Sequence, residues 1–162
     1  SPPSEPLLWR WSIGEFSSAF SRDSNIHQEL VQEVFVETFL GLFRYQPRAP
    51  FSHWLTRIAT RVGYRYWKQQ ARRKSNPTVP LEDWDQLEVR QLEEYSPGEA
   101  ADILHRLLSL LPPRDRLVLT LRFLEDQSIE KTAELTGWSK SMVKVQTLRA
   151  KKKLKKVFEM SE

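Results

Sequence analysis

Eight lysine and arginine side chains, and no acidic ones, fall between Ser139 and Lys156 near the end of this 162-residue chain. Val143, Ala150 and Leu154 recur through the same stretch at helical spacing, which predicts a helix with one buried stripe. Like charges crowded on the other faces repel one another, so this helix favours a polyanionic partner. The chemistry that these residues support is binding to nucleic-acid phosphates.

The face opposite the buried stripe mixes basic and apolar side chains. Val145 and Leu148 stand among the charges, where contact with water does not explain them. Contact with thymine methyl groups in a DNA major groove does. The candidate DNA-contacting residues of this helix are Lys140, Ser141, Lys144, Val145, Leu148, Arg149 and Lys152.

A short helix and a tight turn precede the long basic helix. Ser128 is placed to begin the short helix, and Ala133 is small enough to let the second helix pack closely. Gly137 supplies the left-handed conformation that ends a helix, and Ser139 then caps the next one. The spacing matches a DNA-binding helix-turn-helix, with an ordinary helical hairpin as the structural alternative.

A second basic block, with nine lysines and arginines and no acid, covers residues 44–74. On the predicted helix, five basic side chains fall within less than a quarter turn of each other: Arg57, Arg61, Arg65, Lys68 and Arg72. Tyr64 and Trp67 flank this basic face, and Tyr45 and Phe51 lie in a Pro-containing loop before the helix. Basic groups that follow a backbone, with rings that stack on bases, favour single-stranded or locally melted nucleic acid. The alternative is that Tyr64 and Trp67 are core residues.

A third surface is acidic, on the helix predicted for residues 25–43. One face of that helix carries Gln28, Glu29, Gln32, Glu33 and Glu37. Val36 and Leu40 lie beside this face. A polyanion would be repelled there, so the face is either solvated or a protein docking surface, and we favour docking.

The elements that position these residues are predicted to be helical, because glycine is scarce and the 3.6-residue periodicity is long. The predicted helices cover residues 7–20, 25–43, 52–74, 99–111, 114–124, 128–135 and 139–158. Asn25 and Ser52 are the expected caps of the second and third helices. In the helix at residues 7–20 the expected inward side chains are Trp9, Ile13, Phe16 and Phe20. In the helix at residues 25–43 they are Ile26, Leu30, Val34, Phe35, Thr38, Phe39 and Leu42. In the helix at residues 114–124 they are Leu117, Leu121 and either Phe123 or Leu124.

Residues 75–88 contain two prolines and clustered acids without helical periodicity, so they are predicted to be a linker. The fold class is therefore all-α, with two small helical domains at residues 7–74 and 100–160. An acidic, Pro-containing linker at residues 75–99 joins them. Each domain is small enough that docking on a partner is expected to contribute to its order.

Several classes of function have no support in this sequence. The chain has no Cys, and its three His residues lie too far apart for a local metal motif. No apolar run is long enough to span a membrane, and no Gly-rich phosphate loop or nucleophile elbow is present. We therefore expect no metal, no cofactor, no membrane insertion and no enzymatic activity, in a protein of the cytoplasm.

Three stretches of the chain resemble the extracytoplasmic-function (ECF) sigma factors of the sigma-70 family. They are QELVQEVFVETF (28–39), PFSHWLTRIATRVGYRYWKQQARRK (50–74) and LLSLLPPRDRLVLTLRFLEDQSIEKTAELTGWSKSMVKVQTLRAKKKL (107–154). The resemblance implies that residues 7–74 form sigma region two and residues 100–160 form sigma region four. It further implies a bacterial sigma factor that binds core RNA polymerase, directs it to specific promoters and helps to melt the minus-ten element.

The same resemblance assigns partners and residues. The partners are the polymerase core, through its β′ coiled coil and β flap, and promoter DNA, with an anti-sigma factor as a further candidate. The residues implied for polymerase binding are Glu29, Gln32, Glu33 and Val36. Those implied for the minus-ten element are Tyr45, Gln46, Arg48, Arg57, Arg61, Tyr64, Arg65, Trp67 and Lys68. The helix-turn-helix would read the minus-thirty-five element through the seven residues named above.

Two other interpretations remain open at this point. A stand-alone helix-turn-helix regulator would bind duplex DNA without a polymerase-docking helix or aromatic residues for melting. A protein-interaction module with basic faces would explain the charge, but not the placement of Val145 and Leu148.

Overall fold

The computed structural model describes residues 16, 18–46, 50–73 and 97–160. Every regular element in these ranges is a helix or helical turn, which confirms the predicted all-α class. The helices are α2 (Ser24–Gly41), α3 (Phe51–Arg73), α4 (Pro97–Leu108), α5 (Pro113–Leu119), α6 (Ile129–Thr136) and α7 (Lys140–Met160). A 3₁₀ turn, η1 (Leu42–Arg44), follows α2, and a π-helical turn, η4 (Thr120–Leu124), continues α5. The predictions for the first helix before Phe16, for Arg48 and for the linker up to residue 96 lie outside the described residues.

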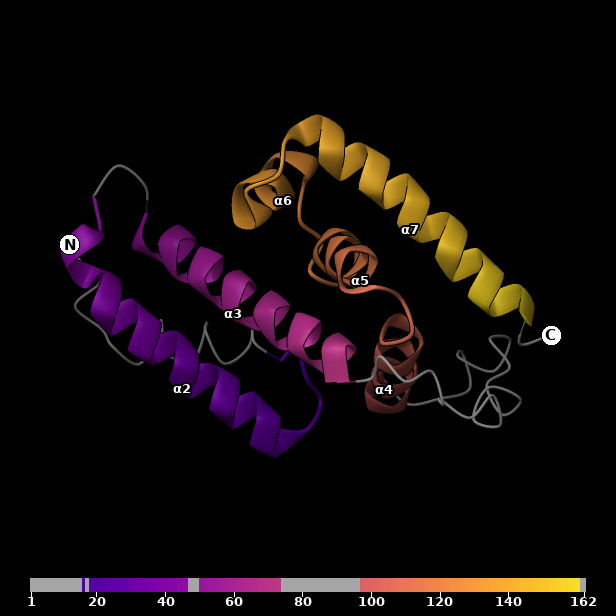
Figure 1. The fold of residues 1–162 in the computed structure, drawn as a ribbon, viewed down its shortest axis with the longest axis horizontal. Coiled ribbons are helices and arrows are strands. Elements are labelled where there is room, and N and C mark those ends of the chain that lie inside the picture. Colours follow the sequence, from indigo (N-terminus) through magenta and orange to yellow (C-terminus); the bar gives the residue numbers. More distant parts are fainter. Residues whose placement is uncertain (1–15, 17, 47–49, 74–96, 161–162) are drawn as a thin grey trace.

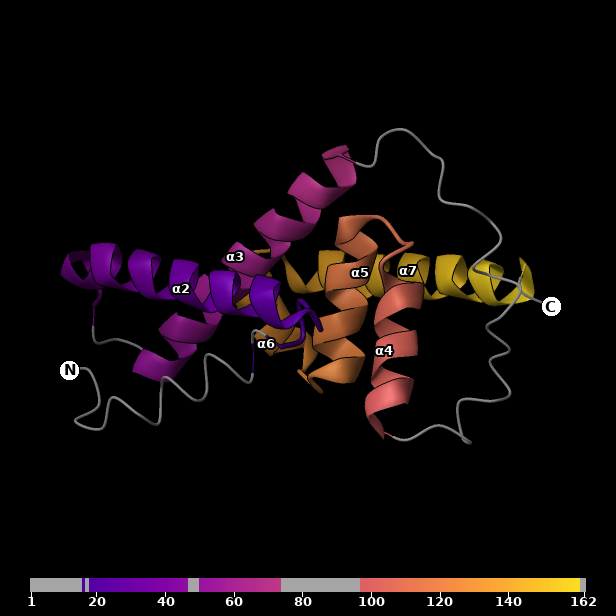
Figure 2. The ribbon, with the colours of Figure 1, turned by 90° about the horizontal axis from the view of Figure 1, so that it is seen from below.

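The helices form two neighbouring groups. One group is α2 and α3, and the other is α4, α5, α6 and α7. Helices α2 and α3 lie side by side at one end of the molecule, and α7 runs along the other side (Figure 1). Helices α5 and α6 lie between α3 and α7, and both contact α3 (Figures 1 and 2). The two groups are therefore packed directly on each other.

Two predicted helix starts are displaced by one or two residues. Helix α2 is capped by Asp23, not Asn25, and the Asp23 carboxylate accepts hydrogen bonds from the backbone N–H groups of Asn25 and Ile26. A carboxylate at this position also offsets the positive end of the helix dipole. Helix α3 begins at Phe51 instead of after Ser52, and the Pro50 carbonyl oxygen already accepts from the N–H groups of His53 and Trp54.

The buried stripe of α2 is narrower than predicted. Leu30, Val34 and Thr38 are buried against α3, as expected for positions four residues apart. Phe39 and Leu42, which were also expected to face inward, are 69% and 37% exposed. Among the described residues, α3 is the main helix that packs on α2, and it covers one face of α2, so the flanking apolar positions stay exposed.

The predicted inward stripe of α5 ends earlier than the sequence indicates. Leu117 and Leu121 are fully buried, but Phe123 and Leu124 are 52% and 37% exposed. Both exposed residues fall in the π-helical turn η4, where the wider winding rotates side chains away from the α-helical register.

The core does not divide cleanly between the two groups of helices. One cluster joins buried residues of α2 and α3 to Leu117, Leu121 and Leu135 from α5, η4 and α6. A second cluster unites α4, α5 and α7, with Val143 and Ala150 fully buried in it. The predicted inward residues Phe16 and Phe20 belong to the first cluster. In the part of the chain that the structure describes, no helix is long and apolar enough to cross a membrane, and no three potential metal ligands cluster.

Candidate functional site

The predicted helix-turn-helix is present with its expected capping contacts. The Ser128 hydroxyl accepts a hydrogen bond from the N–H of Lys131 at 3.0 Å. Gly137 ends α6 in the left-handed conformation, with φ of 77°. The Ser139 hydroxyl then accepts from the N–H of Met142 at 3.1 Å, at the start of α7. These contacts set the angle at which α7 leaves the turn.

The two faces of α7 differ as the sequence predicts. Val143 and Ala150 are fully buried, and Thr147 is 8% exposed. Val145 and Leu148 are 46% and 62% exposed on the other side. The structure places on exposed positions all seven residues predicted to contact DNA: Lys140, Ser141, Lys144, Val145, Leu148, Arg149 and Lys152.

A buried carboxylate that the sequence analysis missed orients α7. Asp115 in α5 is 1% exposed. One of its oxygens accepts from the Gln146 amide at 2.7 Å and the other from the Lys153 ammonium at 2.8 Å. Lys153 is therefore engaged within the protein. The only signal in the sequence was an acid between two arginines, which does not reveal its burial.

The exposed face of α3 carries part of the predicted basic and aromatic surface. Arg57, Arg61 and Lys68 are exposed, and the Lys68 ammonium lies 4.5 Å from the centre of the Tyr64 ring. Tyr64 is half-buried, because its ring meets Trp138 edge-on at 6.3 Å between ring centres. Burial raises the pKa of the Tyr64 hydroxyl above its usual value. Tyr64 is thus shared between α3 and the turn that follows α6.

Trp67 was predicted to bind DNA, but the structure buries it. Its side chain is 2% exposed, and its ring lies 4.7 Å from that of Phe20. The indole N–H donates to the Phe20 carbonyl oxygen at 2.9 Å, and the Arg116 guanidinium covers the ring at 4.1 Å. Trp67 is a core residue in this structure, because neighbours distant in sequence cover both its edge and its face.

Arg65 belongs to an ion-pair cluster between α3 and α2. Its guanidinium donates to Glu33 at 2.6 Å and also to Glu37. The hydrogen bond with Glu37 is the main reason that the pKa of Arg65 rises above its usual value. One residue predicted to bind DNA and one predicted to bind polymerase are therefore paired with each other.

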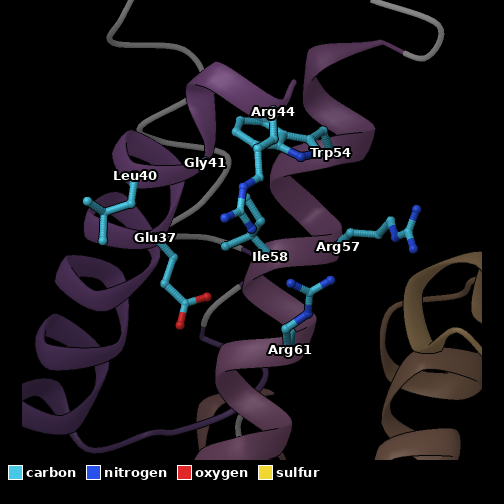
Figure 3. A pocket seen from close by; sticks show the side chains of 8 residues that line it. All are labelled: Glu37, Leu40, Gly41, Arg44, Trp54, Arg57, Ile58 and Arg61. Carbon is cyan, nitrogen blue, oxygen red and sulfur yellow. The ribbon is translucent and has the colours of Figure 1, made fainter. Parts of the chain in front are cut away.

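A hollow of about 440 Å³ lies between the end of α2 and the first half of α3. Arg44, Arg57 and Arg61 line it together with Trp54 and Glu37 (Figure 3). The sequence analysis did not assign Arg44 or Trp54 to a site. Three cations beside an indole ring suit a phosphate next to a base.

Tyr45, after η1, contacts two rings of α3 edge-on or at a tilt. Tyr45 lies 5.3 Å from Phe51 and 5.1 Å from Trp54, measured between ring centres. Its ring is only partly buried, and Gln46 beside it is exposed. Of the loop residues predicted to capture bases, Tyr45 contacts Trp54, which lines the hollow, and Gln46 is exposed, whereas Arg48 lies outside the described residues.

The outer face of α2 is acidic and apolar. The four residues predicted to bind polymerase are exposed: Glu29, Gln32, Glu33 and Val36. Phe39, Leu40 and Phe43 add apolar surface beside them, and Phe43 is 97% exposed. An exposed apolar patch of this kind with a polar rim indicates a protein-docking site. The sequence analysis noted Leu40 there but assigned Phe39 to the core.

Comparison with known proteins decides the family. The family model described as sigma-70 region 2 matches residues 15–73, and the one described as sigma-70 region 4 matches residues 101–154. Together the two matches cover more than two thirds of the chain. The chain is an ECF sigma factor of the sigma-70 family. It is thus an RNA polymerase sigma factor, which directs transcription initiation.

Curated relatives agree with this assignment. The sigma factor is 28% identical over 145 residues to the ECF RNA polymerase sigma factor SigX of Bacillus subtilis (strain 168), covering 86% of this chain and 74% of SigX. It is 26% identical over 136 residues to the ECF RNA polymerase sigma-E factor of Escherichia coli (strain K12), covering 76% of this chain and 69% of that protein.

Solved structures share the fold of the sigma factor. The sigma factor RpoE from Bartonella quintana, in complex with the anti-sigma factor NepR, has a TM-score of 0.59 at 15% identity and covers 96% and 95% of the two chains. CnrH, in complex with the cytosolic domain of CnrY, has a TM-score of 0.61 at 18% identity and covers 96% and 86%.

Proposed function

We propose that this sigma factor binds core polymerase through the outer face of α2, captures melted minus-ten DNA along α3 and reads the minus-thirty-five element with α7. The two binding domains correspond to the predicted ranges 7–74 and 100–160. The proposal assigns no catalytic step to the protein, which would act by positioning polymerase in the cytoplasm.

One observation carries the DNA-reading part of this proposal. Helix α7 buries Val143, Thr147 and Ala150 on one face and exposes Val145 and Leu148 between basic side chains on the other. Exposed apolar side chains at the N-terminal half of a recognition helix suit contacts with base edges and thymine methyls. The basic residues around them suit phosphates, which fix register without reading sequence.

Binding of melted DNA requires a change from the arrangement described above. Tyr64 is the candidate ring for base stacking on α3, and Trp138 covers its edge. Arg57, Arg61 and Lys68 are exposed and able to contact phosphates while Tyr64 is still covered. We therefore propose that charge captures the DNA first, and that α6 and its turn move off α3 before a base stacks on Tyr64.

Protein partners follow from α2 and from the similar structures. The exposed carboxylates and apolar side chains of α2 suit a basic surface with an apolar centre, as proposed for the β′ coiled coil. Region four is proposed to contact the β flap. Because RpoE was solved with the anti-sigma factor NepR, an anti-sigma factor is also proposed as a partner of this chain.

Run-off transcription with the full chain and core polymerase, on a library of promoter sequences, tests the proposed function. Wild-type protein should initiate from a restricted set of promoters, and only when core polymerase is present. Val145→Ala and Leu148→Ala should change which promoters are used, since one base-edge contact is worth roughly 1–3 kcal/mol of discrimination.

Two further variants separate sequence reading from general attraction to DNA. Lys152→Ala should weaken binding to all promoters about equally and reduce the salt slope by about one unit. Glu130 is exposed on α6, and Glu130→Ala is the matched control, which should change neither the binding to promoters nor the salt slope. Unaltered promoter choice in the Val145 and Leu148 variants would contradict the assignment of α7. Specific duplex binding that is indifferent to core polymerase would favour a stand-alone regulator instead.

A further inference from the structure

A second hollow, of about 520 Å³, lies where the two groups of helices meet. Ser21 and Arg22, before α2, line one side together with Tyr66 and Gln70 of α3. The opposite side comes from α4, from Ser109 after it, and from Arg116 of α5. Helix α5, which carries Arg116, lies against α3 (Figure 1). The walls of the hollow therefore come together only when the two groups are packed on each other.

Arg116 is a partly buried cation at this junction, and it has no ion pair with any described residue. Its guanidinium lies over the Trp67 ring at 4.1 Å, and its Nε atom is buried without an acceptor among the described residues. Burial lowers the pKa of Arg116 to about 10. A partly desolvated charge with an unpaired donor is unfavourable, so the site gains from an anion that reaches the guanidinium.

The acids that line the hollow are already engaged elsewhere. Asp102 pairs with Arg22 at 2.8 Å, and Asp23 accepts from two backbone N–H groups at the start of α2. Neither forms an ion pair with Arg116. Burial and nearby arginines lower the pKa of His105, so this side chain is neutral at pH 7 and supplies no charge of its own.

We propose that this hollow binds a small organic oxyanion, a carboxylate or a phosphate ester, through the guanidinium of Arg116. A guanidinium presents paired donors that match both groups. The hydroxyls of Ser21 and Ser109 and the amide of Gln70 line the same space and offer further hydrogen bonds. The volume is in the range of sites for small molecules.

The consequence for the sigma factor is a ligand-stabilised closed arrangement. Because the ligand site exists only while α4 and α5 lie against α2 and α3, binding opposes their separation. The movement proposed above takes α6 and its turn off α3. Because α6 is joined to α5 through η4, a ligand that holds α5 against α3 also opposes that movement. The anion site depends on the geometry around Arg116 and not on which DNA the protein binds. An experiment can therefore refute the anion site without refuting the proposed function, and the reverse.

The Nε–H resonance of Arg116 in the full-length protein reports on the site directly. Inorganic phosphate and acetate are titrated in parallel, at pH 7 and constant ionic strength made up with chloride. A saturable shift with phosphate indicates a phosphate ester as the ligand class, and one with acetate indicates a carboxylate. Arg116→Lys assigns the resonance.

Arg122 provides a matched internal control. Its Nε–H is also buried without an acceptor among the described residues, but its guanidinium donates to the Gln127 carbonyl oxygen at 2.6 Å. The Arg122 resonance should stay in place while that of Arg116 moves. Equal shifts at both, no shift at Arg116 with either anion, or an Arg116 Nε–H already hydrogen-bonded before any addition would overturn the proposal.

A distance measurement tests the coupling to closure. The sequence contains no Cys, so Gln69→Cys and Glu130→Cys place one spin label on α3 and one on α6, at exposed positions. At ten times its Kd, the effective anion should lower the ratio of open to closed molecules about 11-fold. Arg116→Met should abolish this response, and an unchanged ratio in the wild-type background would contradict closure by the ligand.

Discussion

Gly63→Ala should destabilise the sigma factor, although alanine is the better helix former. In a helix interior this exchange alone favours folding by about 1 kcal/mol. A Cβ on Gly63, however, would lie 2.2 Å from Cδ1 and 2.3 Å from Cγ of Phe20, so the ring must leave its position. Phe20 is 1% exposed and packs on Trp67. Its burial is worth roughly 2–3 kcal/mol, and its contact with the indole about 1 kcal/mol more.

The net loss worked from these contributions is about 2–3 kcal/mol. For a chain of this length it corresponds to a fall in Tm of about 4–12 °C. Thermal unfolding followed by circular dichroism measures it. Gly98→Ala is the matched control, because a Cβ at Gly98 meets nothing within 4 Å, and its Tm should stay the same or rise slightly.

A double-mutant cycle identifies Phe20 as the cause. In a Phe20→Ala background, Gly63→Ala should no longer be destabilising, because the clash has been removed. If Gly63→Ala raises the Tm of the wild-type protein as Gly98→Ala does, Phe20 does not pack on α3 at this point. The burial of Trp67 would then lose its main support.

The remaining predictions concern the α2 face, the α5–α7 contact and the response to acid. Glu29→Lys should weaken binding to labelled core polymerase in a competition assay while leaving the circular dichroism spectrum unchanged. Lys153→Met should lower the free energy of unfolding, measured in urea, by about 1–3 kcal/mol, because it removes one of the two groups bonded to buried Asp115. Lys155→Met is the control and should change this free energy by less than about 0.5 kcal/mol. Burial, with two nearby arginines, lowers the pKa of His105 below 6.5, so the unfolded chain takes up a proton that the folded chain resists. The urea midpoint should therefore fall as the pH drops below about 6.5, and His105→Gln should reduce that fall.

The features that the sequence predicted correctly depend on short-range chemistry. A serine before a helix, a glycine after one and apolar residues four apart act within a single turn, so the caps and faces of α6 and α7 follow from their own residues. The exposure of Val145 and Leu148 was predictable for the same reason. The identity of the family also lies in local motifs, which the matches to residues 15–73 and 101–154 confirm.

The features that were missed depend on partners distant in sequence. Trp67 has the spacing of a surface ring, but Phe20 and Arg116 bury it from elements 47 and more residues away. Asp115 looks like a solvated acid until α7 brings two donors to it. Phe39 has the spacing of a core residue, yet no described element covers it. Periodicity predicts which residues share a face, but not which faces a neighbouring helix covers.

The pairing of Arg65 with Glu33 and Glu37 links two surfaces that the sequence analysis treated as separate, the acidic face of α2 and the basic face of α3. Treated separately, the acids of α2 suit a protein partner and the bases of α3 suit DNA. In the structure one guanidinium bridges the two helices, so each of the two binding surfaces includes part of the same ion-pair cluster. A half-exposed ion pair of this kind is worth at most about 1 kcal/mol, which a protein or nucleic-acid partner readily exceeds. A basic partner that draws Glu33 away leaves Arg65 with one carboxylate instead of two, and so strengthens the positive potential along α3. Under the proposed function, polymerase docking on α2 and DNA capture on α3 are therefore electrostatically coupled through this ion-pair cluster.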